Sequence, residues 1–300
     1  MSLLSEYTAS LKHPEAEEFL DLVAFRPLAF ILVKGVLPFP ITPNQITIVA
    51  ILFGIAAGIL YSFGTPDSFF IAATLYAFSN ILDCADGMVA RLKRNGTEVG
   101  RIIDGVADYV TSIAVYLGLG VGLTRMGVDL PLGTWTVVII AGISHALHAF
   151  LFDYYRNEFL ACLRGETSAT AQELAESRQR LEDLRQARVG FFRRALILLY
   201  IRYSALQVRS GGGRASGVDA QDYVERNRLA LRLWSFVGST THIAALVVMT
   251  YIDRIDLFFF YAAVAANVWM ILLWLFQTGR GSRRVRSASR TTPTLPEANG

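Results

Sequence analysis

The sequence has few of the residues that mark disulfide-bonded proteins and zinc sites. Its 300 residues include two cysteines, Cys84 and Cys162, and four histidines. Two isolated cysteines exclude a disulfide framework, and we interpret Cys84 as a small packing residue. His145 and His148 are three residues apart on one predicted helix face, but no further His or Cys follows nearby. We therefore expect them to make polar contacts within a helix bundle.

Three further absences narrow the class of protein. The sequence lacks a basic patch with interleaved aromatic residues, the feature that would indicate a groove for nucleic acid. No nucleic-acid partner is therefore expected. The segment Ser210–Arg214 is rich in glycine but lacks the Lys-Ser/Thr of a phosphate-binding loop, so we interpret it as a linker. Residues 1–20 carry too many acids and too short an apolar run for a signal peptide. We expect the first membrane span to direct insertion instead.

Long apolar blocks dominate what is present. Hydrophobic residues make up 53% of the chain, and the mean hydropathy is +0.41. The blocks alternate with charged stretches, which is typical of membrane proteins. Six of them are long enough to cross most of a bilayer at about 1.5 Å per residue. They cover residues 42–63, 67–86, 102–123, 134–152, 232–251 and 255–276. We therefore predict an all-α, multi-pass membrane protein with six transmembrane helices.

Lys and Arg are distributed asymmetrically between these spans. Of the 28 Lys and Arg residues, only Arg125 and Arg254 fall on one of the two sides. The positive-inside rule then places both termini and the segment between the second and third spans in the cytoplasm, as expected for an inner membrane protein. The net charge of +3 is explained by this topology and by anionic lipid headgroups.

The regions outside the spans suggest a five-part organisation. It comprises an N-terminal interfacial region (1–40), spans one to four (41–152), a cytoplasmic helical insertion (153–231), spans five and six (232–277) and a disordered tail (278–300).

Two of these parts carry more specific expectations. A helix is predicted from Pro14 to Phe25, ending before Pro27, and an apolar strip follows that suits an amphipathic helix on the inner leaflet. A buried core helix is the alternative for that strip. In the insertion, Leu174, Leu181 and Leu184 follow a weak heptad spacing, and residues 191–206 resemble a surface helix better than a seventh span.

Acidic residues are concentrated between residues 83 and 108, after the second span. If two helices flank a turn near residues 95–96, each helix presents a pair of carboxylates on one face. The four residues are Asp83, Asp86, Asp104 and Asp108. Carboxylates gathered in a small volume repel each other unless a cation lies between them. Oxygen ligands without His or Cys favour Mg²⁺, Mn²⁺ or Ca²⁺ over zinc. The alternative is that these are solvated loop charges beside a membrane.

The full pattern D-x-x-D-G-x-x-A-R-x8-G-x3-D-x3-D resembles the signature of the CDP-alcohol phosphatidyltransferase family at every fixed position. The resemblance covers residues 40–152 and, in general layout, the last two spans. It implies transfer of a phosphatidyl group from CDP-diacylglycerol to an alcohol, with release of CMP, in phospholipid biosynthesis. It also implies two bound Mg²⁺ or Mn²⁺ ions, a CDP-linked substrate taken from the bilayer, and a homodimer.

The same resemblance assigns roles to individual residues. The four aspartates would bind metal, and Asp108 would also act as general base toward the acceptor hydroxyl. The CDP moiety would contact Asn44, Thr47, Gly87, Ala90, Arg91, Thr97 and Gly100. Gly87, Ala90 and Gly100 leave room for a ligand, and Arg91 offers a planar donor fork suited to phosphate. Helix capping is the alternative for the stretch that contains Asn44 and Thr47, and Thr97 could be a plain loop hydroxyl.

The acceptor is left open by the sequence. Candidate contacts are Arg156, Arg202, Arg232 and His242. The arginines favour a phosphorylated acceptor, such as glycerol 3-phosphate or inositol phosphate, although headgroup contacts explain them nearly as well. Transfer of phosphocholine or phosphoethanolamine from a CDP-alcohol to diacylglycerol fits the same motif. A non-catalytic cation-binding or transport protein is a further alternative, but the spans offer few charges away from their cytoplasmic ends.

Overall fold

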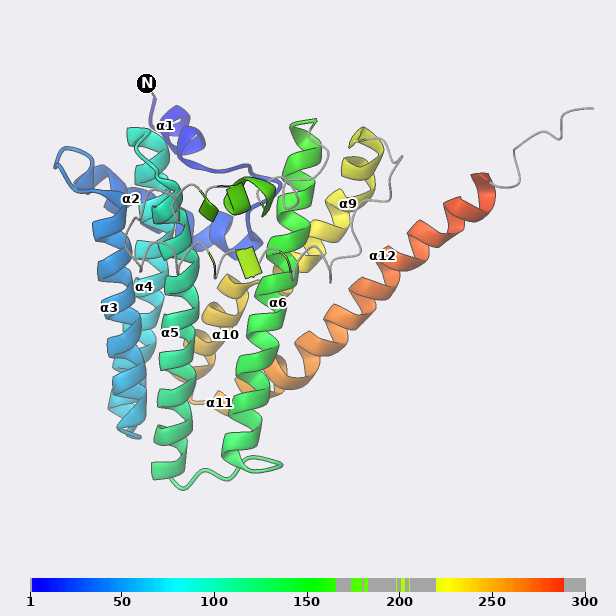
Figure 1. Cartoon of the computed structure of the whole chain (residues 1–300). Coiled ribbons are helices and arrows are strands. Elements are labelled where there is room, and N and C mark those ends of the chain that lie inside the picture. Colours follow the sequence, from blue (N-terminus) through cyan, green and yellow to red (C-terminus); the bar gives the residue numbers. More distant parts are fainter. Residues whose placement is uncertain are drawn as a thin grey trace, which may run out of the picture.

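The helices of this protein lie side by side in a bundle, with a shorter set of helices across one end (Figure 1). The computed structural model describes residues 2–165, 174–179, 181–182, 198, 201–202, 205 and 220–288. The α-helices are α1 (Leu3–Ser10), α2 (Arg26–Val36), α3 (Pro43–Ser62), α4 (Pro66–Lys93), α5 (Glu98–Arg125), α6 (Thr134–Leu163), α9 (Ala220–Trp234), α10 (Ser239–Tyr251), α11 (Ile255–Phe260) and α12 (Ala266–Ala288). Shorter π and 3-10 turns are η1 (Asp21–Phe25), η2 (Ser235–Val237) and η3 (Tyr261–Ala265). No strand occurs among the described residues, so the predicted all-α class is confirmed.

Six helical segments are long and apolar enough to cross a membrane, one for each predicted span. They are Pro43–Ser62, Pro66–Lys93, Ile103–Arg125, Thr134–Leu163, Ala220–Tyr251 and Ile255–Gln277. The prediction of six spans is therefore confirmed. The second and fourth helices extend further than predicted at the end nearest α1, and the fifth segment already begins with α9.

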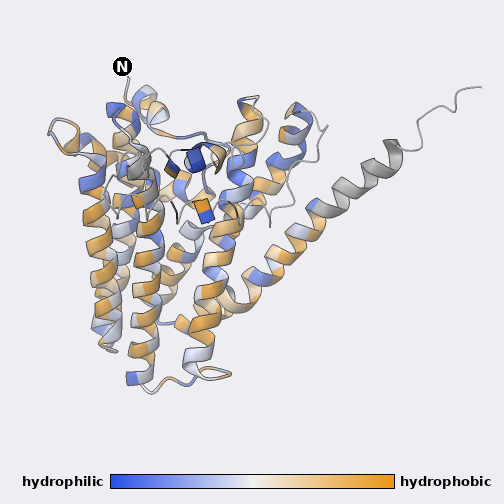
Figure 2. Ribbon diagram, in the orientation of Figure 1, coloured by the Kyte–Doolittle hydropathy of each residue, from blue (hydrophilic) through white to orange (hydrophobic). Residues whose placement is uncertain are grey.

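Apolar side chains cover much of the outer surface of the spans. Leu52, Ile113 and Ile143 are 60%, 59% and 64% exposed. Figure 2 shows hydrophobic residues along α3, α5 and α6, and hydrophilic residues toward the end that holds the N-terminus. A surface of this kind is buried when lipid surrounds the bundle.

Close contact between α3 and α5 positions the beginning of α5. Gly58 on α3 lies against Ala114 and Gly118 of α5, and Gly122 of α5 lies against Tyr61 of α3. Gly54 and Gly58 are four positions apart on α3, as Gly118 and Gly122 are on α5. A Cβ atom added at Gly118 would lie 2.0 Å from the carbonyl oxygen of Gly58. Small residues at this spacing let two membrane helices approach backbone to backbone. Since α3 also packs against α4, the three helices form one tight unit.

The N-terminal region differs from the predicted helix. The helix begins at residue 19 rather than at Pro14, and it continues through η1 and α2 without a break at Pro27. In the widened η1 turn the N–H of Arg26 bonds to the carbonyl of Asp21. Pro27 therefore falls in the first turn of α2, where a residue without an N–H is tolerated.

The apolar helix α2 has two different faces. Phe25, just before it, and Ala29 and Val33 on it are buried, whereas Leu28 and Ile31 are 49% and 71% exposed. One face is thus part of the core, and the other is available to lipid. The core alternative therefore holds for one face of the strip, and its position on the inner leaflet stays a prediction.

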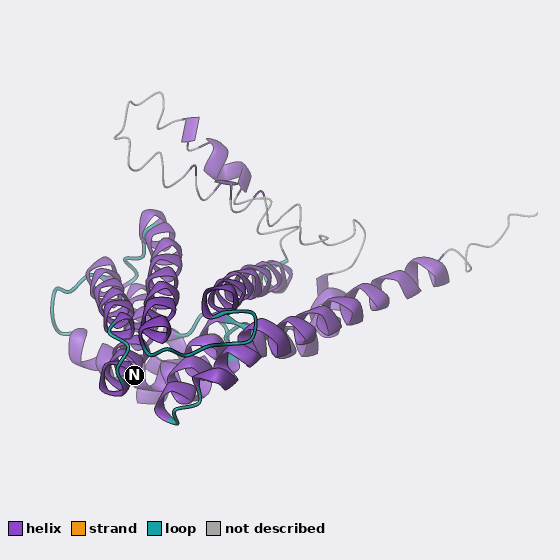
Figure 3. Cartoon of the chain, turned by 90° about the horizontal axis from the view of Figure 1, so that it is seen from below, coloured by secondary structure: helices purple, strands orange, loops and turns teal. Residues whose placement is uncertain are grey.

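The remaining expectations concern the insertion and the tail. Leu174 and Leu181 are buried with Ile201, and Val106 of α5 packs against them. Leu184, Ser210–Arg214 and most of residues 191–206 lie outside the described residues. Helix α12 extends to Ala288, whereas the sequence indicated disorder from residue 278. Figures 1 and 3 show α12 leaning away from the other helices.

Candidate active site

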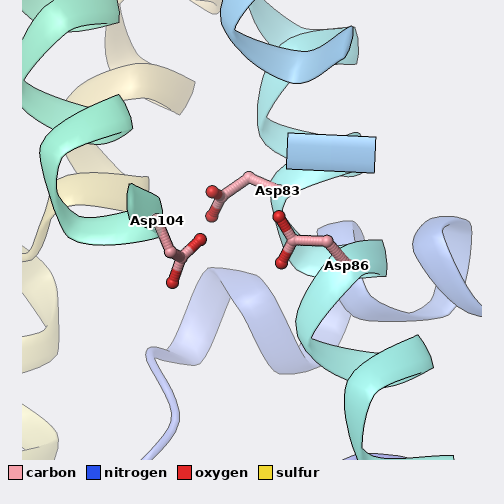
Figure 4. Close-up of side chains that lie close together, drawn as sticks. All are labelled: Asp83, Asp86 and Asp104. Atoms are coloured by element: carbon pink, nitrogen blue, oxygen red, sulfur yellow. The ribbon is translucent and has the colours of Figure 1, made fainter. Parts of the chain in front are cut away.

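Three carboxylates converge where α4 approaches its end and α5 begins. Asp83 and Asp86 come from α4 and Asp104 from α5, and Figure 4 shows them pointing toward one another. One oxygen of each lies within 4.8 Å of the others. Asp86 is buried, and the other two are half-buried. The predicted confrontation of carboxylates from two helices is thus present for three of the four aspartates.

Local sequence explains why the two helices meet at this place. Helix α4 ends at Lys93, and Arg94 adopts the left-handed conformation with φ of 51°. Thr97 then caps α5, because its Oγ1 accepts a hydrogen bond from the N–H of Gly100 at 3.0 Å. The reversal occurs near residues 95–96, as predicted. It places Asp104 within the first two turns of α5, directly opposite the last turns of α4.

The hydrogen bonding of the carboxylates suits a site that binds a divalent cation. Thr47 Oγ1 donates a hydrogen bond to Asp86 Oδ2. Asp104 Oδ1, by contrast, is buried and has no hydrogen-bond partner in the protein. A buried carboxylate oxygen without a partner costs roughly 1–3 kcal/mol or more. Hard oxygen donors in a group of three are the ligands that Mg²⁺ and Mn²⁺ prefer.

Asp108 lies one helical turn beyond Asp104 and has different surroundings. Together with Asp83 it lines a cavity of about 20 Å³, just large enough for a water molecule. Asn80 lines the same cavity, and its buried amide Nδ2 has no hydrogen-bond partner. Asn80 was not singled out in the sequence. Its position three residues before Asp83, on the same face of α4, was the available signal.

The residues expected at the CDP moiety fall into two neighbouring groups. At the start of α3 and α5, Asn44 Oδ1 lies 2.7 Å from the position of a Cβ atom added at Gly100, and Thr97 Oγ1 lies 3.0 Å from it. Lys93 donates to the carbonyls of Phe39 and Ile41, at 2.7 Å and 2.9 Å, and so fixes the loop before α3.

The second group lies on the last turns of α4. The guanidinium of Arg91 lies over Gly87, with Nη1 3.2 Å from the position of an added Cβ atom. Arg91 Nε donates to the carbonyl of Ser10, and its Nη2 is buried without a partner. Ala90 is half-buried one residue earlier. The open space over Gly87 therefore lies beside an Arg91 N–H group that has no acceptor in the protein.

The four candidate acceptor residues are not brought together. Arg156, near the end of α6, forms an ion pair with Asp153. Its positive charge lowers the pKa of Lys12, while Asp104 acts in the opposite direction, so all three groups lie in one electrostatic neighbourhood. Arg202 is exposed. Only Arg156 is connected in this way to the carboxylates.

Arg232 and His242 have other partners. Arg232 donates to the carbonyls of Pro14 and Glu17, at 3.2 Å and 3.4 Å. His242 is 1% exposed and bonds to His148 at 3.0 Å. Its ring also stacks on His145, which bonds to Ser239 at 3.1 Å. The histidines therefore make polar contacts inside the bundle, as expected for His145 and His148.

Comparison with known proteins finds a family whose model matches part of the chain. The model of the CDP-alcohol phosphatidyltransferase family matches residues 40–175. The chain is 29% identical over 102 residues to phosphatidylinositol phosphate synthases of Mycobacterium bovis and Mycobacterium tuberculosis, which is 34% of this chain and 46% of theirs. It is 35% identical over 68 residues to a bifunctional IPC transferase and DIPP synthase of Thermococcus kodakarensis, covering 23% and 15% of the two chains. The chain thus spans less than half the length of these relatives.

Proposed function

Because residues 40–175 of this chain form a CDP-alcohol phosphatidyltransferase domain, we propose that the protein transfers a phosphatidyl group from CDP-diacylglycerol to an alcohol and releases CMP. One observation carries this proposal. Three carboxylates from two neighbouring helices converge within 4.8 Å, at the position of the signature. A hard divalent cation is the natural partner of such a group.

Different residues of the chain would bind the metal and the nucleotide. Asp83, Asp86 and Asp104 would hold the metal, and Thr47 would orient Asp86 through its hydrogen bond. When bound, Mg²⁺ or Mn²⁺ supplies positive charge that neutralises the diphosphate and the charge developing on CMP as it leaves. Arg91 would bind a diphosphate oxygen with its unused Nη2. Asn44, Gly87, Ala90, Thr97 and Gly100 would leave space for the nucleotide and bind it.

The reaction itself exchanges one phosphorus–oxygen bond for another. The acceptor hydroxyl oxygen bonds to the phosphorus of the phosphatidyl group, and the bond from that phosphorus to the bridging oxygen of CMP breaks. The hydroxyl proton passes to Asp108, which lies next to Asp83 at the wall of the small cavity. The electron pair of the broken bond leaves with CMP.

We further propose a phosphorylated polyol as the acceptor. Arg156 and Lys12 lie in the electrostatic neighbourhood of Asp104, so positive charge is available beside the carboxylates. Phosphate on the acceptor would be recognised by such cations. The matched relatives named phosphatidylinositol phosphate synthases support this class of acceptor.

Orientation and assembly belong to the same proposal. The end of the bundle that holds the carboxylates would face the cytoplasm, since nearly all Lys and Arg residues outside the spans fall on that side. An aqueous acceptor could then meet a lipid donor whose acyl chains stay in the bilayer. The homodimer implied by the family resemblance is testable by crosslinking in membranes.

The decisive experiment measures CMP release by the purified protein from CDP-diacylglycerol. Inositol phosphate and glycerol 3-phosphate should support release, whereas inositol, serine and glycerol should support much less. Chelation of divalent cations should abolish release, and adding Mg²⁺ or Mn²⁺ should restore it. Asp83→Ala should lose Mn²⁺ binding in a direct binding assay as well as activity. No release with any acceptor, or unchanged Mn²⁺ affinity in Asp83→Ala, would contradict the proposal.

A further inference from the structure

The chain between α1 and α2 crosses the site from one helix to another. We call residues 10–25 the N-terminal strap. Near its beginning the carbonyl of Ser10 accepts the hydrogen bond from Arg91 of α4. Toward its end the carboxylate of Asp21 accepts from Thr240 of α10 at 3.0 Å and from Cys84 at 3.7 Å. Figure 4 shows the N-terminal chain, in faint blue, passing beside the three carboxylates.

The strap is held in shape by a buried ion pair. Glu17 Oε2 lies 2.8 Å from Arg26 Nη2, and both side chains are less than a tenth exposed. The other oxygen of Glu17 accepts a hydrogen bond from the N–H of Lys12 at 3.0 Å. Breaking a buried ion pair from one side is far more costly than breaking an exposed one. The loop between residues 12 and 17 is therefore closed on itself.

Helices α9 and α10 hold the strap from the other side. Arg232 donates to two strap carbonyls, those of Pro14 and Glu17. The carboxyl group of Glu18 lies against Gly238, where an added Cβ atom would be only 2.3 Å from it. Any side chain at position 238 would displace Glu18. These contacts fix the position of the strap relative to the bundle independently of Arg91.

The strap therefore fixes the guanidinium of Arg91 through one nitrogen and leaves another nitrogen without a partner. Its Nε is bonded to Ser10, while Nη2 is buried without a partner and the group lies over Gly87. A buried donor of a charged group without an acceptor is costly. The planar fork of arginine matches two phosphate oxygens when its orientation is set beforehand.

We propose that the N-terminal strap is one wall of the donor site, and that the carbonyl of Ser10 is a positioning group that aims the free edge of Arg91 at the diphosphate of a CDP-linked lipid. This inference rests on the proposed function for the identity of the ligand. The strap acts through Arg91 and touches no reacting atom. Its loss should therefore weaken binding of the donor and leave the acceptor's KM unchanged.

A deletion of residues 2–11 tests this directly, because it removes the Ser10 carbonyl. The donor KM, and the Kd of CMP measured by calorimetry with Mn²⁺ present, should each rise by about ten-fold or more, the effect of one charge-assisted hydrogen bond. Arg91→Ala alone should have at least that effect. The deletion made in the Arg91→Ala background should add less than two-fold, because both changes remove the same interaction. Multiplicative effects of the two changes, or an unchanged donor KM after the deletion, would overturn the proposal.

A pair of point variants keeps the test valid if the deletion does not fold. Arg232→Ala releases two strap carbonyls and should raise the donor KM in the same direction. Arg226→Ala is the matched control, since Arg226 lies on the same helix and forms a partly exposed ion pair with Asp222 of α9 rather than with the strap. A rise in the acceptor KM alone in Arg232→Ala would identify Arg232 as an acceptor contact and contradict the strap. CMP binding separates the two levels of proposal: a wild-type protein that binds CMP but releases none from any lipid fails the proposed function, and the deletion still decides the role of the strap.

Discussion

Asp108 differs from the three clustered aspartates in its neighbours. Asp83, Asp86 and Asp104 share one small volume, whereas Asp108 meets Asp83 across a cavity that also contains the unpartnered amide of Asn80. A carboxylate outside the tight cluster keeps an oxygen available for a proton. This separation is why we assign the general base to Asp108 and metal binding chiefly to the other three.

Asp108→Asn should therefore lower kcat by about 10²- to 10⁴-fold, the usual effect of losing a general base. The Kd of CMP measured with Mn²⁺ should stay within a factor of two or three, because the three clustered carboxylates remain. Asp67→Asn, an exposed change at the opposite end of α4, is the control and should behave as wild type. Near-normal turnover in Asp108→Asn would exclude Asp108 as the base.

Individual residues show which contacts the sequence could predict. The four aspartates, Gly87 and Arg91 stand at fixed spacing on two helices, so helical geometry alone predicted that carboxylates would converge. The contact between Arg91 and Ser10 could not be predicted in this way. It joins residues 81 positions apart and uses a backbone carbonyl, which every residue type has. Arg232 was predicted as an acceptor contact because a side chain's type does not reveal whether its partner is a ligand or a carbonyl.

The junction between the strap and α10 contains a buried acid that should make stability depend on pH. Glu18 is 6% exposed. Burial, with the neighbouring charge of Asp21, raises the pKa of Glu18 well above its ordinary value, although the N–H groups of Thr240 and Thr241 partly oppose this. A carboxyl group whose pKa is raised in the folded state favours folding at low pH. Its contribution is complete below the ordinary pKa of about 4.3 and is lost as pH rises through the raised pKa.

Glu18→Gln should remove this dependence, because the amide cannot ionise and still offers an oxygen to α10. We expect the melting temperature of the wild-type protein in detergent to fall more steeply between pH 5 and pH 8 than that of Glu18→Gln. The matched control is Glu15→Gln, whose carboxylate forms the exposed pair with Arg228. Parallel pH profiles for the wild type and Glu18→Gln would show that Glu18 does not ionise in this range.

The packing of α3 against α5 is a second junction on which the site depends. Gly118→Val would place side-chain atoms where Gly58 has its carbonyl, 2.0 Å from the added Cβ. The helices must separate, at a cost of about 1–3 kcal/mol or more. We expect a lower melting temperature and weaker Mn²⁺ binding, since Asp104 would move with α5. Gly105→Ala on the same helix is the control for stability, because its added Cβ meets nothing within 4 Å. If Gly118→Val kept the wild-type affinity for Mn²⁺, the geometry of the carboxylate cluster would not depend on the packing of α3 against α5.

Elements were predicted with uneven success for a physical reason. Each span depends on a long apolar run that lipid selects, and all six runs gave helices at the expected places. The N-terminal region is shaped by tertiary contacts instead. Buried Glu17 pairs with Arg26, and buried Asp21 accepts a hydrogen bond from Thr240 of α10. From the sequence alone, the acids of this region suggested only a helix start near Pro14. The π turn that accommodates Pro27 likewise follows from packing and has no signal of its own.

The bundle has a polar turn at each end, and the two turns can be used to test its orientation in the membrane. Asn95 lies in the turn beside the carboxylates, and Asp129 lies in the turn between α5 and α6 at the other end of α5; both are exposed. The native cysteines, Cys84 and Cys162, are buried, so a cysteine introduced at either turn can be labelled against a quiet background. An enzyme that uses an aqueous nucleotide and a soluble acceptor needs its site on the cytoplasmic side. The Lys and Arg distribution predicts the same orientation.

Labelling of single-cysteine variants in intact cells tests that orientation. A membrane-impermeant maleimide should modify Asp129→Cys without treatment, and it should modify Asn95→Cys only after the membrane is permeabilised. Substitution at these exposed turn positions leaves the bundle contacts intact, so CMP release should persist in both variants and show that the labelled molecules are folded. The reverse pattern would place the carboxylates outside the cell, away from the cytoplasmic pool of nucleotide. Since the arginines that flank the site would then face the wrong leaflet, that result would contradict both the orientation and the proposed supply of substrate.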